Sequence, residues 1–162
     1  MQISNLPGHS RVWIFQSDRK LRDSEEAIIR RELDQFIPQW AAHGSNLYGG
    51  FAVQKKCFIV IGVDETKAPA SGCSIDALTR VIKELGAQLK IDFFNRLCLA
   101  VEMDAETIEI MSMEDFKRKI VDGVVNPDTI VYNNLVRNKA ELDEGWRTKA
   151  KNSWHSNLFS LV

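Results

Sequence analysis

The apolar positions between residues 12 and 40 predict a strand followed by a helix. The run Val12-Trp13-Ile14-Phe15 is rich in β-branched and aromatic residues and precedes the polar residues 17–19, which is typical of a short strand. From residue 23 onward, apolar residues recur every three or four positions, which is the period of a helix with one buried face. This stripe comprises Ile29, Leu33, Phe36, Ile37 and Trp40.

The ends of this helix are also marked in the sequence. Asp23 and Glu26 have the spacing of a capping box at its start. Pro38 is expected to bend or weaken the last turns, because proline lacks the backbone N–H of a regular helix. Gly44 offers a left-handed cap directly after His43. The helix is therefore predicted to end at His43-Gly44.

Two strands and a second helix are predicted next. Residues 47–53 and 57–63 have strand-like composition and are joined by the polar turn Gln54-Lys55-Lys56. A loop then leads to a helix that starts near Ser74 and has the most regular apolar stripe of the chain. The stripe comprises Ile75, Leu78, Ile82, Leu85 and Leu89.

The remaining residues predict shorter elements. Strands are expected at residues 97–102, 107–111 and 129–132, the first two joined around Asp104-Ala105. One short helix is capped by Ser112 and stopped by Gly123, and another runs from Asn138 to about Gly145. The apolar residues expected to face inward from the first of these helices are Met113, Phe116, Ile120 and Val121.

The order of the elements indicates the fold class. The first six read β-α-β-β-α-β, which is the ferredoxin-like arrangement of an antiparallel sheet with two helices on one face. We therefore expect an α+β fold with a ferredoxin-like core and an additional C-terminal strand and helices. The length of 162 residues suits one domain. Residues 1–10 are expected to be flexible, and the apolar tail 146–162 is expected to dock.

Composition narrows the class of partner and the compartment. Lysine plus arginine (21) nearly balances aspartate plus glutamate (22), so there is no basic footprint for nucleic acid or an anionic membrane. The longest apolar run, residues 57–63, is far shorter than the roughly 18 residues of a membrane span, and the N-terminus lacks a secretory signal pattern. Three widely spaced cysteines do not form a disulfide framework. We predict a cytoplasmic protein with neither nucleic acid nor membrane as a partner.

The segment Ser71-Gly72-Cys73-Ser74 is the best candidate for a chemical site. It leads into a helix, whose free N–H groups and macrodipole favour a thiolate or a bound anion. Cys73 is therefore the candidate nucleophile. Gly72 permits close approach of a ligand, and the hydroxyls of Ser71 and Ser74 are candidate ligand-binding groups. The same residues also suit a tight turn with a helix cap and no chemistry.

Other residues are candidate partners of this segment. A nucleophilic cysteine usually works with a base, for which His43 and His155 are the candidates. Asp64, at the end of a central strand, is a candidate carboxylate, and Asn134, after the last strand, is a candidate ligand-binding amide. Each also has a simpler explanation, because such residues commonly serve as caps, solvated loop residues or turn formers.

Several common motifs do not occur in the chain. There is no metal-ligand spacing, phosphate-binding loop, dinucleotide fingerprint or nucleophile elbow. We therefore predict no metal, no cofactor and no P-loop NTPase activity.

Several segments resemble those of a small bacterial family. They are residues 12–19, 39–40, 42–44, 71–76, 129–136 and 153–155, so that the resemblance spans nearly the whole chain. The family is found mainly in Bacteroidetes and is often labelled ABC transporter ATPase. That label requires a phosphate-binding loop, which this chain lacks, so we interpret it as an erroneous label. The resemblance implies a bacterial cytosolic protein and assigns no catalytic residues.

Two hypotheses for the function follow from the sequence. The first is a domain with a small-molecule or anion site, or thiol chemistry, at the Cys73 loop. The second is a non-catalytic protein-interaction module that either forms a homodimer through the open face of its sheet or presents its docked C-terminal tail. Whether the protein is an enzyme stays open at this point.

Overall fold

The computed structural model describes residues 2–104 and 107–162, so that Ala105 of the predicted turn lies outside the described residues. Contacts divide the chain into two compact units. The first unit comprises Met1–Asn95 and Arg137–Glu141, and the second comprises Arg96–Val136 and Leu142–Val162. Both contain helices and antiparallel strands. The α+β class expected from the sequence is therefore confirmed.

The first unit is built on a three-stranded antiparallel sheet in the order β1-β5-β4. Its strands are β1 (Arg11–Gln16), β4 (Gly49–Gln54) and β5 (Phe58–Val63). Ile61 on the central strand lies opposite Trp13 on one side and Phe51 on the other. All three strands lie within one or two residues of the predicted ranges, because their β-branched and aromatic runs are long and end at polar turns.

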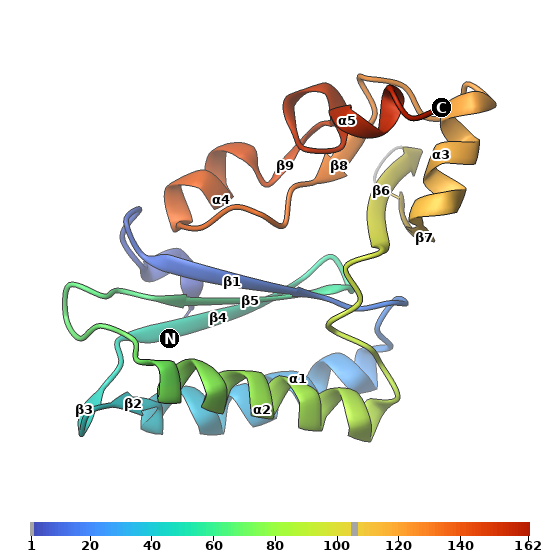
Figure 1. The fold of residues 1–162 in the computed structure, drawn as a ribbon. Coiled ribbons are helices and arrows are strands. Elements are labelled where there is room, and N and C mark those ends of the chain that lie inside the picture. Colours follow the sequence, from blue (N-terminus) through green and yellow to red (C-terminus); the bar gives the residue numbers. More distant parts are fainter. Residues whose placement is uncertain (1, 105–106) are drawn as a thin grey trace. The chain divides into compact units, whose positions relative to one another are not determined.

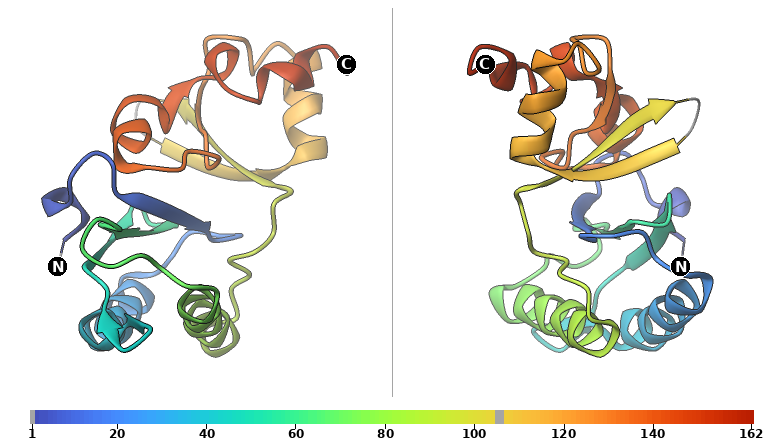
Figure 2. Two further views of the ribbon diagram at one scale, coloured as in Figure 1. Left: turned by 60° about the vertical axis from the view of Figure 1, so that its left-hand side comes forward. Right: turned by 90° about the vertical axis from the view of Figure 1, so that its right-hand side faces the viewer.

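Helices α1 (Asp23–Phe36) and α2 (Gly72–Leu89) cover the same face of this sheet (Figures 1 and 2). Their predicted apolar stripes, apart from the half-buried Ile75, form one core with the sheet. The largest fully buried members of this core are Ile29, Leu33, Ile59, Ile61, Leu78 and Ile82. The short 3-10 helix η1 (Ile3–Asn5) precedes β1, and Ile3 and the following Leu6 are buried beside Gly62 of β5, outside this core.

The end of the first helix differs from the prediction. α1 ends at Phe36 and is followed by the 3-10 turn η2 (Ile37–Gln39), which contains Pro38. His43 and Gly44 form instead the turn of a hairpin between β2 (Ala41–Ala42) and β3 (Ser45–Asn46). Both turn residues have left-handed backbone, with φ values of 51° and 79°, as a two-residue hairpin turn requires. The predicted helix cap was wrong because a residue that adopts a positive φ suits a hairpin turn as well as the end of a helix.

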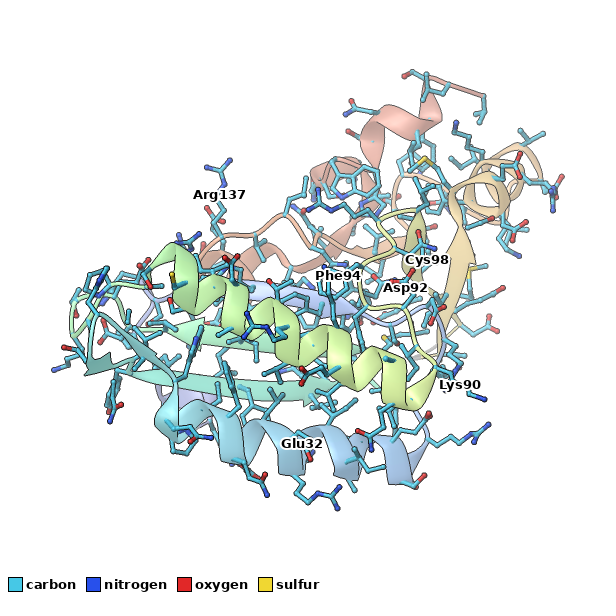
Figure 3. All side chains as sticks on the ribbon, turned by 60° about the horizontal axis from the view of Figure 1, so that its bottom comes forward. Glu32, Lys90, Asp92, Phe94, Cys98 and Arg137 are labelled. Carbon is cyan, nitrogen blue, oxygen red and sulfur yellow. The ribbon has the colours of Figure 1, made fainter. Side chains whose placement is uncertain are left out.

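The second helix ends without a glycine. Lys90, labelled in Figure 3 at the end of α2, has a φ of 58° and donates its N–H to the carbonyl of Gly86. The chain then passes so close to the helix that a Cβ on Gly86 would lie 2.6 Å from the carbonyl oxygen of Ile91. Phe94 packs edge to face against Phe15 of β1, with ring centroids 5.6 Å apart.

The second unit has a separate antiparallel sheet in the order β7-β6-β8-β9. Its strands are β6 (Cys98–Asp104), β7 (Thr107–Ser112), β8 (Ile130–Tyr132) and β9 (Arg147–Lys149). The other elements of this part of the chain are α3 (Met113–Val121), α4 (Lys139–Gly145), which begins in the first unit, η3 (Ala150–Asn152) and α5 (Ser156–Phe159). Ser112 caps α3 as expected by accepting the N–H of Asp115 at 3.1 Å, and Gly123 follows with a φ of 77°.

The core of the second unit lies between its sheet and the helices α3 and α5. Its buried members are Leu99, Val101, Met111, Phe116, Val125, Val131, Ala150 and Leu158. Trp154 and Phe159 of the tail pack against this core. Val121 was expected to face inward, but it is 71% exposed, because it lies in the last turn of α3 beyond the reach of the core.

The ferredoxin-like core is not confirmed. The order β1-β5-β4, with two helices on one face, agrees with the first three strands of that arrangement. The strand expected to complete the same sheet is β6, which pairs with β7 and β8 in the second unit. Among the described residues, no helix is long and apolar enough to cross a membrane.

A histidine is buried in the core of the second unit. His155 is 1% exposed, its ring stacks on Trp154 with centroids 4.0 Å apart, and its Nδ1 lies 2.5 Å from the Ser153 hydroxyl oxygen. Burial lowers the pKa of His155 to about 4, because the charged imidazolium loses its hydration there.

This burial predicts a loss of stability in mild acid. The unfolded chain protonates His155 near its ordinary pKa of 6.5, whereas the folded chain does so only near 4, so acid favours unfolding. The free energy of unfolding should fall by about 1.5 kcal/mol between pH 6.5 and pH 5 from this residue. Urea titrations of the wild type and of His155→Asn measure this difference. His155→Asn has no imidazole at this position, so its free energy of unfolding should lack this fall.

The turn between β4 and β5 predicts a stabilising substitution. Lys55 and Lys56 have φ values of 58° and 60°, a conformation that costs a non-glycine residue about 1 kcal/mol. Lys55→Gly should therefore raise the free energy of unfolding by about 0.5–1 kcal/mol. The control is Lys67→Gly, at an exposed position without a positive φ, which should give no gain. An equal effect of both variants in thermal unfolding would contradict the argument.

Candidate functional site

Cys73 lies in the first turn of α2, which begins at Gly72, two residues before the predicted start. Ser71 is the N-cap, and its hydroxyl accepts the N–H of Ser74 at 3.1 Å. The Ser74 hydroxyl oxygen accepts the N–H of Ser71 at 2.8 Å, which completes a capping box. The two serine hydroxyls, predicted as ligand-binding groups, are therefore used to cap the helix.

The capping box leaves two backbone donors at the start of α2. The N–H of Ile75 donates to the carbonyl of Ser71, and that of Ser74 is held by the box. The first N–H groups of a helix have no partner within the helix, so those of Gly72 and Cys73 are open to solvent or to a ligand. A Cβ on Gly72 would have no heavy atom within 4 Å in the described structure, so there is free space next to this backbone.

A surface hollow of about 580 Å³ lies beside this turn. We call it the Cys73 hollow. Its lining comes from the end of α1, from η2, from the β2–β3 hairpin and from the first turn of α2, and comprises Phe36, Gln39, Trp40, Ala41, Ala42, His43, Ser71, Cys73, Ser74 and Ala77. The structure thus brings Cys73 and its candidate base His43 to one hollow.

The hairpin places His43 at this position. Ala42 is buried, β2 contacts α2, and the tight turn carries the exposed His43 at the tip of the hairpin. The base of the hairpin is closed by the N–H of Leu47, which donates to the carbonyl of Trp40 at 2.8 Å. A histidine that the sequence suggested as a helix cap is instead presented at the edge of the hollow.

Aromatic side chains form the apolar wall of the hollow. Trp40 is 2% exposed and packs against Phe36, with ring centroids 5.4 Å apart, and against Trp13 at 6.0 Å. Its indole N–H donates to the carbonyl of Ser74 at 2.8 Å. The apolar stripe of the sequence identified Trp40 and Phe36 as core residues, but nothing in the pattern indicated that they also line a hollow.

The three cysteines differ strongly in environment. Cys73 is exposed, Cys98 is half-buried and Cys57 is fully buried. Burial raises the pKa of the Cys57 thiol to about 12, so it is unreactive at neutral pH. Cys73 is therefore the most accessible thiol of the three.

Asp64 does not line the Cys73 hollow. Its Oδ1 accepts the hydroxyl of Thr66 at 2.6 Å and the N–H of Thr66 at 3.1 Å, and it lies 3.0 Å from Nε2 of His9. These bonds, that of the Thr66 hydroxyl first, lower the pKa of the Asp64 carboxyl although the group is buried. The contact with His9 spans 55 residues, and no sequence signal could have indicated it.

Asn134 and His155 belong to the second unit and are held within it. The Asn134 side-chain oxygen accepts the indole N–H of Trp146 at 2.9 Å. His155 is enclosed by Phe116, Trp154 and Ser153, as described above. Of the candidates, only Cys73, His43, Ser71 and Ser74 line one hollow, with Gly72 between them. No group of three or more potential metal ligands occurs among the described residues.

Comparison with known proteins assigns no family. No family model, no curated protein and no solved structure matches the chain. The function of the Cys73 hollow therefore has to follow from its own residues.

Proposed function

We propose that the first unit binds a small molecule in the Cys73 hollow. The observation that carries the proposal is that Cys73 and His43, from two separate elements 30 residues apart, line the same hollow. Its volume of about 580 Å³ is in the range of sites for small ligands. A wall of aromatic and small apolar groups faces a rim with a thiol, an imidazole and an amide, which is the usual composition of such sites.

The chemistry of the lining favours a ligand with an apolar body and one acidic group. Phe36, Ala41 and Ala77 offer the accessible apolar surface, with the buried Trp40 behind them. The free N–H groups at Gly72 and Cys73 and the positive end of the α2 macrodipole favour an anion at the opposite side. The capping box uses one acceptor site of the Ser71 hydroxyl, so its O–H is a further candidate donor to the ligand, whereas the Ser74 hydroxyl both accepts from and donates to Ser71.

Thiol chemistry is a second use of the same hollow. A ligand with an α,β-unsaturated carbonyl group bound there would meet the Cys73 sulfur. The sulfur adds to the β-carbon, the carbon–carbon π bond breaks and its electron pair moves to the carbonyl oxygen, while the thiol proton passes to His43 of the lining and from there to the adduct. Release of the adduct and repeated turnover would distinguish an enzyme from a binding domain.

We propose in addition that the first unit has a ferredoxin-like core. The strand order β1-β5-β4 with two helices on one face supports this proposal. We also propose a bacterial cytoplasmic location, which the family resemblance of the sequence implies. The homodimer alternative predicts twice the chain mass in light scattering, and a monomer would contradict it.

The first test of the site is selective labelling of the thiols. Iodoacetamide should modify Cys73 of the native protein at least about tenfold faster than Cys98 or Cys57, because only Cys73 is exposed. Peptide mass spectrometry after timed quenching measures the three rates. Cys73→Ser should remove the fast phase and leave the others unchanged. Labelling of Cys57 as fast as Cys73 would contradict the structure.

The second test separates binding from folding. Gly72→Asp adds a carboxylate where the α2 macrodipole stabilises it by about 0.3–1 kcal/mol, and the Cβ enters open space. The same carboxylate should repel an acidic ligand. With benzoate as the probe, the amide NMR signals of residues 72 and 73 should change their chemical shifts in the wild type. In this variant, benzoate should leave the signals of the same two positions unchanged.

The control for this experiment is Gly72→Asn, which has nearly the same size and no charge. It should keep most of the benzoate response. No response of the wild type at tens of millimolar benzoate, the range expected for the weakest fragments, would overturn the acidic-ligand proposal. An equal loss in both variants would show that shape rather than charge is sensed there, which would also contradict it.

A further inference from the structure

We infer that Trp40 is the positioning residue of the Cys73 hollow, setting the place of the hairpin that carries His43 relative to the helix turn that carries Cys73. This inference rests on the proposed function of the hollow. Trp40 is the residue between η2 and the hairpin, and its main chain and its side chain each bond to one side of the hollow.

The main chain of Trp40 holds the hairpin. Its carbonyl accepts the N–H of Leu47 at 2.8 Å, which closes the base of the hairpin. The hairpin itself has only two residue pairs, Ala41 with Asn46 and Ala42 with Ser45. So short a ladder is marginal by itself, so its position depends on what holds its base.

The side chain of Trp40 holds the turn of α2. Its indole N–H donates to the carbonyl of Ser74 at 2.8 Å in a buried setting. Ser74 is directly bonded to Cys73 in the chain, and its own hydroxyl and N–H are part of the capping box. A shift of the indole therefore moves the turn that carries the thiol.

The ring of Trp40 has little freedom to move. It is 2% exposed and lies between Trp13 and Phe36. A Cβ on Gly49 would lie 3.5 Å from ring carbon Cε3, so β4 approaches the ring with its bare backbone. The sheet therefore fixes the ring, and the ring fixes both sides of the hollow. A phenylalanine would fill most of this space but could not donate to Ser74.

The test compares Trp40→Phe with Trp146→Phe. Both variants remove the indole N–H of a buried tryptophan that donates a hydrogen bond, but Trp146 belongs to the second unit and does not line the hollow. Trp40→Phe should weaken benzoate binding by at least about fivefold, since the buried carbonyl of Ser74 loses its donor. It should also speed hydrogen exchange at the Leu47 amide, because the ring at the base of the hairpin is then no longer bonded to α2. Trp146→Phe should leave both unchanged at a comparable loss of thermal stability, which is measured in parallel.

The outcomes separate this inference from the proposed function. Benzoate binding that is equal in the two variants, or Leu47 exchange that is equally fast in both, would overturn the positioning role and leave the ligand site standing. If the wild type does not bind benzoate, two measurements still test the positioning role: hydrogen exchange at the Leu47 amide and the rate at which iodoacetamide modifies Cys73. A change of both quantities in Trp40→Phe, with neither changed in the control variant, supports the inference.

Discussion

The hydrogen bond from the Trp40 indole N–H to the carbonyl of Ser74 joins two segments that lie 34 residues apart in the sequence. It ties the end of α1 and the hairpin after it to the start of α2, while the ring belongs to the core beneath the sheet. The core of the first unit and its candidate site therefore meet at one residue. A buried aromatic with a polar edge suits this task, because its ring is fixed by packing and its N–H has to find a partner.

Within the Cys73 turn, the structure shows a capped helix start, since the hydroxyls of Ser71 and Ser74 form the capping box. The same turn leaves the Cys73 thiol exposed beside a hollow. The cap and the proposed site therefore use different atoms of one short segment. The polar candidates elsewhere have partners of their own. Asp64 is bonded to Thr66 and His9, and Asn134 to Trp146.

Much of the fold was predictable because its signals are local. The stripes of α1 and α2, the strand runs of β1 and β5, and the cap at Ser112 each lie within one segment. The errors arose where one local signal suits two structures. His43-Gly44 suits a hairpin turn as well as a helix cap. The strand pattern of β6 is equally compatible with pairing in the first sheet or in the second. The contact of His9 with Asp64 spans 55 residues and has no local signal.

The sequence by itself determined the elements, their buried faces, and the place of Cys73 at a helix start. These follow from periodicity and backbone preference, which act over a few residues. Only the tertiary structure decided that His43 and Trp40 join Cys73 at one hollow, that Asp64 does not, and that Asn134 and His155 belong to another core. The physical reason is that side-chain packing and hydrogen bonds between distant segments select among arrangements that local preferences leave equal.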